Sequence, residues 1–430
     1  MTTSINNQIS SNNNGQTVAY GQDALNHNQN ISNMPMGSMM INPNHSPQLA
    51  SMTVGPAQVA SISNNQSNSS NQARQFNQAA KSHTSKIISA HFTPNAATGR
   101  FEIHSDWYLT KLLGSGAYGE VHLAIEIKTS NKYAIKLDSR NNAEMEREIE
   151  FLKKLNGTSN HIPQIVEYGR YSGVSYFVMS LLGTSLSDLK KKRTPQRFSL
   201  ETTLRVGQQM LKGLRAVHNL GIIHRDIKPA NFVIGYKDPK IVYLIDFGLA
   251  SDFNTGPERK NIGFRGTNTY ASVRVHQYKD PGRIDDLVSW FYCMLRIMGM
   301  RFPWDKIKIP PKTERCGSTT INTLYSRLKP DSSKSTKNVK KEVKVAALKK
   351  ERKRIQDQFL VEKKLYPLNT LLKTAESKFK LNYDLFSHLT DHLDSLGFGD
   401  EPKYDYLDQI FEKALLELGI SKKDPYDWEK

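Results

Sequence analysis

The sequence predicts an α+β fold of two lobes, a small strand-rich lobe with one helix and a larger helical lobe, preceded by a disordered polar tail. Residues 1–96 consist mainly of Asn, Ser and Gln, so they cannot bury enough apolar surface to offset the entropy lost on folding. Short strand-like runs separated by turns fill residues 97–182. Over residues 183–430 the apolar residues recur mainly at helical spacing.

Charge and cysteine content indicate which cellular compartment and which kinds of partner suit the chain. The net charge is +18, and a basic insertion at about 310–356 contributes 14 Lys and Arg against 4 Asp and Glu, a net of +10. With only Cys293 and Cys316, no hydrophobic leader and no long apolar run, the chain is expected in a reducing cytoplasm, away from membranes. The Lys-Lys-Lys-Arg run at 190–193 resembles a nuclear-import signal, although a solvated helix end is the simpler explanation.

The small lobe is predicted to begin with strands at 107–113 and 121–127 around the turn Gly-Ser-Gly-Ala-Tyr-Gly at 114–119. Glycines let backbone amides approach a phosphate without obstruction. A dinucleotide-binding turn has similar glycines but opens a helix, whereas this turn joins two strands. Three more strands complete a five-stranded sheet, one ending at 133–136 and two at 165–170 and 175–181.

Helices are predicted from caps and apolar spacing. The helix of the small lobe spans about 142–155, with Asn141 or Asn142 as its cap and Gly157 as its stop. A helix of the larger lobe spans about 199–221. The last helix has an apolar face formed by Leu407, Ile410, Phe411, Ala414, Leu415 and Leu418.

Two motifs of the larger lobe carry chemistry, His-Arg-Asp-Ile-Lys-Pro-Ala-Asn at 224–231 and Asp-Phe-Gly at 246–248. Phosphoryl transfer needs a carboxylate for the attacking hydroxyl, a cation for the phosphate and oxygen ligands for magnesium. These groups are supplied by Asp226, Lys228, Asn231 and Asp246. Singly, each could be a turn residue, a surface charge or a strand end. Their joint order resembles that of protein kinases, which implies the bilobal protein kinase fold with ATP and Mg²⁺ between the lobes.

The kinase resemblance assigns roles to these residues. Asp226 would align the substrate hydroxyl and accept its proton, and Lys228 would stabilise the transferred phosphoryl group. Asn231 and Asp246 would bind magnesium. Lys136 would hold the α- and β-phosphates of ATP.

The nucleotide site is expected to combine the glycine turn with the sheet. Glu148 is the predicted partner of Lys136, with Glu144 and Glu146 as alternatives, and Met179 would lie behind the adenine. The resemblance implies a nucleotide site formed by Leu113, Gly114, Ser115, Gly116, Ala117, Tyr118, Gly119, Glu120, Val121, Ala134, Lys136, Met179 and Leu182.

Further segments narrow the resemblance. The most specific is Gly-Phe-Arg-Gly-Thr at 263–267 followed by Tyr-Ala-Ser-Val at 270–273, where most protein kinases have Ala-Pro-Glu. Together with Leu-Leu-Gly at 181–183, these residues resemble the casein kinase 1 group and, within it, the tau-tubulin kinase branch. Lys228 and Thr267 point to serine or threonine as the acceptor.

Substrate preference follows less directly. The resemblance implies that Asp286 braces the catalytic loop and that acidic or already phosphorylated proteins are favoured substrates. Many relatives have Arg where this chain has Thr269, at a position associated with binding an anionic group, so preference for phosphorylated substrates stays open.

The insertion at 310–356 is longer than the family pattern needs. Its first part is predicted to be flexible. Its second part is predicted to be a basic helix, because Val345, Leu348, Ile355 and Phe359 recur at helical spacing. A solvated helix is the simpler interpretation, and an anion-binding face for acidic proteins, microtubule tails or nucleic acid is the alternative.

The sequence thus predicts a monomeric serine/threonine-protein kinase that uses ATP and Mg²⁺ on protein substrates, among which acidic or cytoskeletal proteins would fit. Neither nucleic acid nor a membrane is the expected partner. One alternative is a catalytically weak kinase-like scaffold, against which the complete motif set argues. The other is an anion- or nucleic-acid-binding module built on the insertion.

Overall fold

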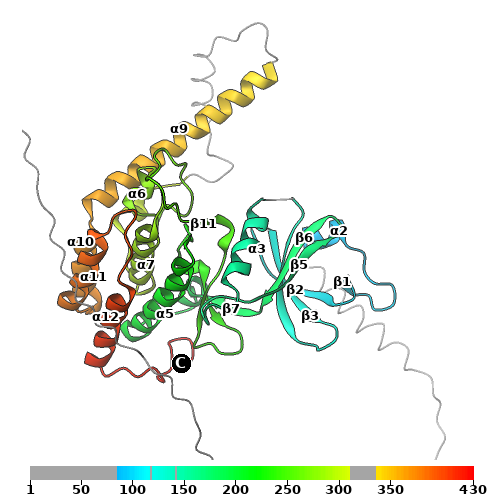
Figure 1. Cartoon of the computed structure of the whole chain (residues 1–430), viewed down its shortest axis with the longest axis horizontal. Helices are drawn as coiled ribbons and strands as arrows, with labels where there is room; N and C mark the ends of the chain where they lie inside the picture. The colour runs from blue at the N-terminus through cyan, green and yellow to red at the C-terminus, as the bar shows by residue number, and fades with distance from the viewer. Residues whose placement is uncertain (1–84, 117–118, 141–142, 310–335) are drawn as a thin grey trace, which may run out of the picture. The chain divides into compact units, whose positions relative to one another are not determined.

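The computed structural model of the chain describes residues 85–116, 119–140, 143–309 and 336–430 (Figure 1). The predicted polar tail up to residue 84 and the first part of the insertion, 310–335, lie outside the described residues. All described residues belong to one compact unit, 68–430. Figure 1 shows a small lobe built on a sheet and a larger lobe of helices, which confirms the predicted fold class.

The small lobe is a six-stranded antiparallel sheet in the order β1-β2-β3-β4-β6-β5. The five predicted strands are present, and β1 adds a sixth along the edge of β2, with Phe101 opposite Leu109. The predicted helix is present as α3, while its expected caps, residues 141–142, lie outside the described residues. These elements are β1 (Phe101–Ile103), β2 (Trp107–Gly116), β3 (Gly119–Glu126), β4 (Lys132–Asp138), α3 (Ala143–Leu155), β5 (Ile165–Tyr171) and β6 (Val174–Ser180).

The small lobe begins earlier than predicted. Helix α2, Lys86–His91, is capped by Ser85 and buries Ile88, which joins Phe92 in the apolar cluster on one face of the sheet. The predicted end of the tail at residue 96 is therefore wrong for residues 85–96. Two apolar side chains fix this short helix to the sheet although the composition around them is polar.

The larger lobe is organised around α5, Leu200–Asn219, which Ser199 caps by accepting a hydrogen bond from the N–H of Thr202. The predicted helix ends as expected before Gly221, whose φ is +66°. The other elements, with η for 3₁₀ turns, are β7 (Leu182–Ser185), α4 (Leu186–Lys191), β8 (Ile222–Ile223), η1 (Pro229–Asn231), β9 (Phe232–Gly235), β10 (Val242–Leu244), η2 (Phe247–Leu249), β11 (Ser251–Asp252), α6 (Val273–His276), α7 (Arg283–Ile297), η3 (Pro303–Lys306), α9 (Thr336–Leu365), α10 (Leu368–Phe379), α11 (Tyr383–Ser395) and α12 (Tyr404–Glu417).

The last helix, α12, buries five of the six residues predicted for its apolar face. The exception is Leu418, which is 50% exposed. It is the residue directly after the helix, and the chain turns at the next residue, Gly419, with φ +64°.

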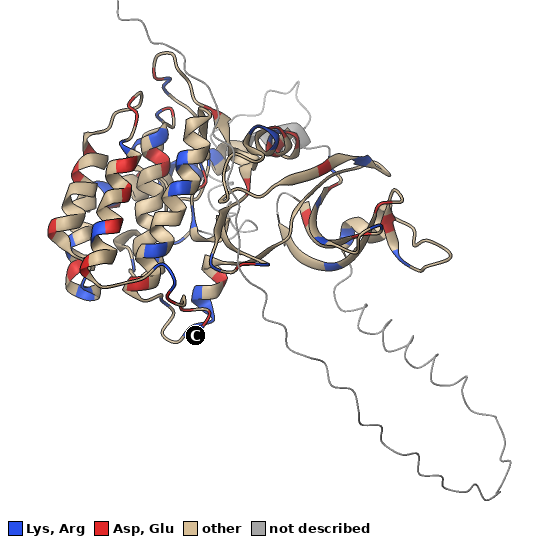
Figure 2. Ribbon diagram, turned by 60° about the horizontal axis from the view of Figure 1, so that its bottom comes forward, with Lys and Arg blue, Asp and Glu red and all other residues tan. Residues whose placement is uncertain are grey.

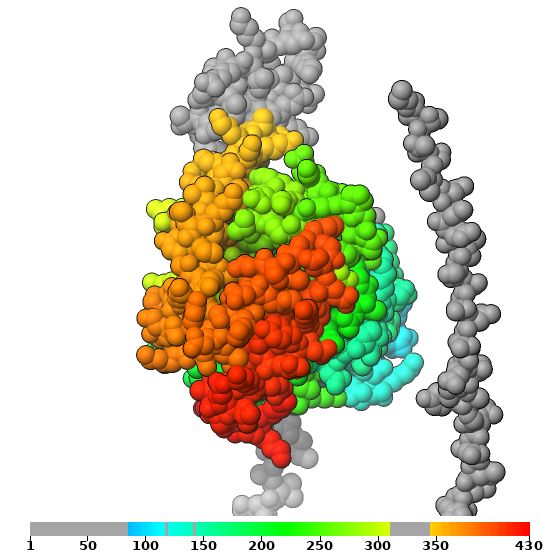
Figure 3. All heavy atoms as spheres, turned by 60° about the vertical axis from the view of Figure 1, so that its left-hand side comes forward, coloured from blue at the N-terminus to red at the C-terminus, as the bar shows by residue number. Residues whose placement is uncertain are grey.

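Helix α9 confirms the predicted basic helix and extends it to Leu365. Its inner face is packed, with Ala347, Ile355 and Phe359 buried, while Val345 is 45% exposed. Figure 3 shows α9, in yellow and orange, lying along the lobe beside the yellow-green segment that contains α6. Its exposed face carries the cations Lys349, Lys350, Arg352, Lys353 and Arg354.

Charges of both signs are spread over the larger lobe. Figure 2 shows Lys and Arg interspersed with Asp and Glu on its helices. The basic excess of the described residues is therefore most concentrated on α9. In the described part of the chain, no helix is long and apolar enough to cross a membrane.

Candidate active site

The loop that carries the first motif lies between β8 and β9, and a carboxylate of α7 holds its start. Asp286 accepts hydrogen bonds from the backbone N–H of His224 at 2.7 Å and of Arg225 at 2.9 Å. His218 Nε2 lies 3.1 Å from the same carboxylate. Burial alone would raise the pKa of Asp286, but these hydrogen bonds hold it below its ordinary value, so the carboxylate is ionised. Asp286 thus has the position expected of a brace.

Asp226 is 6% exposed and contacts two donors. Its Oδ1 accepts a hydrogen bond from Thr267 Oγ1 at 2.7 Å, and its Oδ2 accepts one from Lys228 Nζ at 2.5 Å. The structure therefore brings together the carboxylate of Asp226, the ammonium group of Lys228 and the hydroxyl of Thr267, the threonine that predicts serine or threonine as the acceptor. A hydroxyl placed here meets both a proton acceptor and a cation.

We call residues 263–273 the acceptor segment, because Thr267 reaches Asp226 from it. The segment passes very close to the catalytic loop. At Gly266, φ is +100° and an added Cβ would lie 2.5 Å from the carbonyl oxygen of Arg225. Only glycine fits this position, and the close approach is what allows the next residue to contact Asp226.

Asn231 contacts this group, and Asp246 follows Ile245, whose backbone N–H donates to the carbonyl of Asn231 at 2.9 Å. Asn231 Nδ2 donates to the backbone carbonyl of Asp226 at 2.9 Å, so its amide oxygen faces the other way. Asp246 has left-handed backbone geometry, with φ +71°, and the buried Phe247 packs edge-on against His224 at 5.0 Å. An amide oxygen and a carboxylate fit Mg²⁺, which proteins bind through one or two such groups together with substrate phosphates. The described residues contain no cluster of three or more His, Cys, Asp or Glu suited to a metal.

Lys136 lies between two carboxylates. Its Nζ is 2.5 Å from Glu148 Oε2 and 3.9 Å from Asp246 Oδ1. Burial alone would lower the pKa of Lys136, but the two negative charges raise it, so the ammonium form is retained. Of the three candidate glutamates, the structure brings Glu148 to Lys136, and Glu146 is exposed on the same helix.

One face of the sheet carries the side chains predicted to contact the nucleotide. Cross-strand pairing joins Val121 to Lys136 and Ala134 to Met179, which puts all four on the same face. Gly119 at the start of β3 has φ +116°, and an added Cβ would lie 2.2 Å from the carbonyl oxygen of Leu137. Of the other residues predicted for the nucleotide site, Leu113, Gly114, Ser115 and Gly116 lie at the end of β2, and Leu182 lies in β7. Ala117 and Tyr118 lie outside the described residues.

Glu120 does not share this face. Because side chains alternate along β3, Glu120 lies on the same face as its partner Leu137, opposite to Val121 and Lys136. Its carboxylate accepts hydrogen bonds from Ser85 Oγ and from the first backbone N–H of α2. The side chain of Glu120, a residue predicted for the nucleotide site, is therefore turned away from the nucleotide face and caps α2.

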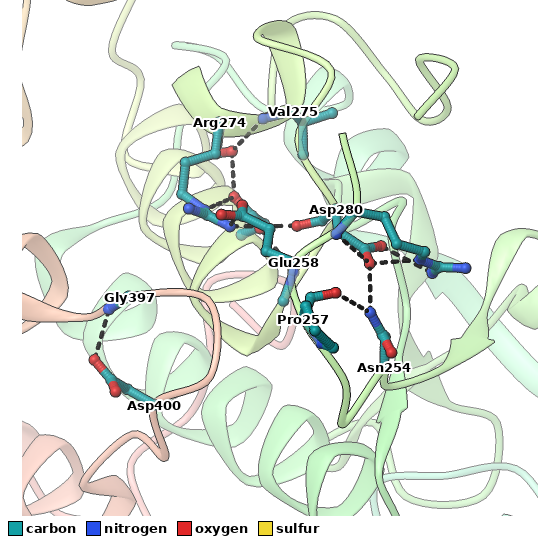
Figure 4. Close-up of polar contacts among 12 residues, drawn as sticks. Asn254, Pro257, Glu258, Arg274, Val275, Asp280, Gly397 and Asp400 are labelled. Atoms are coloured by element: carbon teal, nitrogen blue, oxygen red, sulfur yellow. Dashed lines mark hydrogen bonds and ion pairs between the residues drawn. The ribbon is translucent and has the colours of Figure 1, made fainter. Parts of the chain in front are cut away.

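The chain between η2 and the acceptor segment is tied down by ion pairs (Figure 4). Asp280 accepts hydrogen bonds from Arg259 at 2.7 and 2.9 Å and from Asn254 Nδ2 at 3.0 Å, and Arg274 donates to Glu258 at 2.7 Å. Burial alone would raise the pKa of Asp280, but these donors lower it. Sequence reasoning missed this network, since charged residues far apart in a polar loop carry no periodic signal.

Fold and site together define a two-lobed domain in which one carboxylate contacts both an ammonium group and a hydroxyl. The family model described as the protein kinase domain matches residues 107–364, so the chain belongs to the protein kinase family.

Two curated relatives agree with this assignment. The chain is 33% identical over 336 residues to a probable serine/threonine-protein kinase of Dictyostelium discoideum, which covers 76% of this chain and 57% of the relative. It is 33% identical over 210 residues to a putative casein kinase I of Caenorhabditis elegans, which covers 46% of this chain and 61% of the relative. The chain thus spans less than two thirds of the length of either relative.

Proposed function

We propose that the chain is an ATP- and Mg²⁺-dependent protein serine/threonine kinase of the casein kinase 1 group, with the tau-tubulin kinases as its nearest branch. Asp226 aligns the substrate hydroxyl and takes its proton, and Lys228 stabilises the phosphoryl group in transit. Lys136, held by Glu148, fixes the α- and β-phosphates. Asn231 and Asp246 hold magnesium, which when bound neutralises charge on the phosphates of ATP.

The observation that carries this proposal is the double contact of Asp226. One carboxylate oxygen faces Lys228 and the other faces Thr267, so a cation and the acceptor segment meet at a single side chain. A scaffold without catalysis has no need for this arrangement. The intact ion pair between Lys136 and Glu148 argues in the same direction.

Purified full-length chain with magnesium ATP and a panel of acidic, phosphorylated and neutral peptides tests the activity. We expect incorporation into serine or threonine that is lost in Asp226→Asn. Equal incorporation by both proteins, or none by either, would refute the proposal.

The substrates that fit this chain best are proteins with an acidic segment near the acceptor residue, cytoskeletal proteins with acidic tails among them. A groove of about 650 Å³ runs from Thr267 and Gly266 to α9 and is lined there by Lys349, Arg352 and Lys353. We call it the basic groove. Among the described residues these three cations have no ion-pair partner, so their charge is free for an acidic peptide.

The basic groove is tested by replacing Lys349, Arg352 and Lys353 together with Gln. Three exposed contacts of about 0.5 kcal/mol each correspond to roughly a tenfold higher KM for an acidic peptide, with a weaker dependence on salt. The KM for a neutral peptide is expected to stay unchanged. The matched control replaces three cations of the same helix outside the groove, Lys350, Arg354 and Lys364. If both triple variants gave the same KM, the groove would not be the docking site.

Two alternatives remain distinguishable by experiment. A nucleic-acid-binding module built on α9 would bind oligonucleotides in the presence of Asp246→Asn, and a scaffold would bind ATP without transfer. The monomeric state and the cytoplasmic or nuclear setting stay predictions from the sequence.

A further inference from the structure

The acceptor segment is held from outside by α9, a contact that the proposed catalytic roles do not use. Gln356 and Lys363 of α9 hydrogen-bond to it, Phe359 between them stacks on His276 just beyond it, and all three side chains are buried. They lie one helical turn apart, so they form a continuous inner stripe. The buried stripe of α9 between residues 356 and 363 thus packs against residues 268–276.

Lys363 makes the closest of these contacts. Its Nζ donates hydrogen bonds to the backbone carbonyls of Asn268 at 2.9 Å, of Thr269 at 3.1 Å and of Ala271. The side chain is 1% exposed, and its Nζ lies 4.9 Å from the ring centroid of Trp304. Three carbonyl acceptors need three N–H donors, which only the ammonium form supplies.

Burying the charge of Lys363 costs desolvation free energy, so a charged side chain here indicates a specific role. Burial lowers the pKa of Lys363 well below its ordinary value, and the negative charge of Asp305 opposes that shift without forming an ion pair. A methionine would fill the same space without the desolvation cost. What the ammonium adds is a hydrogen bond to each of three backbone carbonyls, those of Asn268, Thr269 and Ala271.

Gln356 reinforces the same hold. Its Nε2 donates to Asn268 Oδ1 at 2.7 Å, and its Oε1 lies 2.6 Å from His276 Nδ1. Trp304 Nε1 also donates to the carbonyl of Thr269 at 3.0 Å. The side chain of Asn268 and the backbone carbonyls of Asn268, Thr269 and Ala271 are therefore all hydrogen-bonded to Gln356, Lys363 or Trp304.

The grip bears on the reaction through chain continuity. Asn268 follows Thr267, whose hydroxyl donates to Asp226, and Gly266 on the other side lies tightly against the catalytic loop. A displacement of residues 268–271 would therefore move Thr267 relative to Asp226. Lys136 and the nucleotide face lie on β3, β4 and β6 of the small lobe.

We propose that Lys363 is a positioning residue that sets the acceptor segment against Asp226, with Gln356 as its auxiliary. We call the contacts of Lys363 and Gln356 with the acceptor segment the clamp. The kinetic consequence of this inference rests on the proposed kinase activity, but the clamp itself is a property of the fold. It assigns α9 two roles, one for the exposed cations between residues 349 and 354 and one for the buried Gln356 and Lys363, which fix the acceptor side of the site.

The test compares Lys363→Met with Lys364→Met, which removes the same charge from the exposed neighbouring position. We expect Lys363→Met to lower kcat/KM for a peptide at least about tenfold, while the KM for ATP and the slow hydrolysis of ATP without peptide stay within about twofold. Lys364→Met should match the wild type. A parallel loss of peptide transfer, ATP affinity and thermal stability would mean a general folding role and would overturn the proposal.

Hydrogen exchange measured on the same proteins is independent of activity. Lys363→Met should speed exchange of the amides of residues 266–271 and leave those of β3 and β4 unchanged. Gln356→Leu, a smaller perturbation that is expected to fold, should give the same pattern with a smaller amplitude. An inactive wild type would refute the proposed function but not the clamp, whereas an active wild type with unchanged exchange and kinetics in both variants would refute the clamp.

Discussion

His276 tests how α9 is joined to the acceptor segment. Its ring is stacked between Phe264 and Phe359, with ring centroids 5.3 and 5.5 Å away. Burial, with the charge of Lys363 as the second cause, lowers the pKa of His276 to about 3. The perturbation we propose is His276→Gln, which removes the titrating group but keeps a polar side chain beside Gln356.

The magnitude follows from linkage. An imidazole in the unfolded chain has a pKa of about 6.5. Since the folded-state pKa of about 3 is lower, the unfolded state binds more protons between these two values, and stability is lost as the pH falls through that window. Between about pH 8 and pH 5, His276 alone therefore removes about 2 kcal/mol from the free energy of unfolding.

The assay is urea denaturation followed by tryptophan fluorescence at several pH values between about 5 and 8. His276→Gln is expected to be less stable than the wild type at pH 8, yet to lose about 2 kcal/mol less on acidification. The control is His388→Gln, which removes an exposed histidine and should follow the wild-type profile. Parallel profiles for wild type and His276→Gln would refute the assignment of a neutral, buried imidazole at this contact.

Three further predictions concern other parts of the site. Asp286→Asn removes the ionised acceptor of two backbone N–H groups, so peptide transfer should fall about 10²-fold with little change in the binding of ATP, measured by steady-state kinetics and titration. Gly266→Ala should abolish transfer in the same assay, because its Cβ would lie 2.5 Å from the carbonyl oxygen of Arg225; retention of activity would mean that the acceptor segment can move away. Glu120→Gln should weaken the cap on α2 and lower stability by about 1–2 kcal/mol in thermal denaturation, with faster proteolysis next to Ser85 as the local readout.

The residues that sequence reasoning located are those whose type the chemistry prescribes. Asp226, Lys228, Asn231 and Asp246 follow from the needs of phosphoryl transfer; in the structure Lys228 and Asn231 contact Asp226, and Asp246 lies 3.9 Å from Lys136. The side chain of Glu120 points away from the nucleotide face, as strand alternation requires. Since Lys136 must face the phosphates, strand alternation and pairing allow only one of two neighbouring residues of β3 to share its face, and membership in the glycine turn does not decide which.

The clamp residues were not predictable in the same way. Lys363 is one of many lysines in a basic stretch, and its helical position differs from that of Lys364 by a single residue. Val345 and Phe359 both fit the predicted apolar spacing, yet one is exposed and the other is buried. The apolar period of a helix indicates that one stripe packs, but where the helix enters and leaves its contact depends on tertiary structure.

The net charge of the insertion is for this reason a poor guide to its function. Of the exposed cations in the second part of the insertion, Arg354 pairs with Glu351 and lines a different hollow from the basic groove, and Lys350 lines neither of the two. Neutralising all of these cations together would mix residues that can meet a substrate with residues that only meet solvent. Because Lys363 acts from beneath the acceptor segment and the groove cations from beside it, their effects should separate, with KM for acidic peptides changed by the groove variants and kcat changed by Lys363→Met.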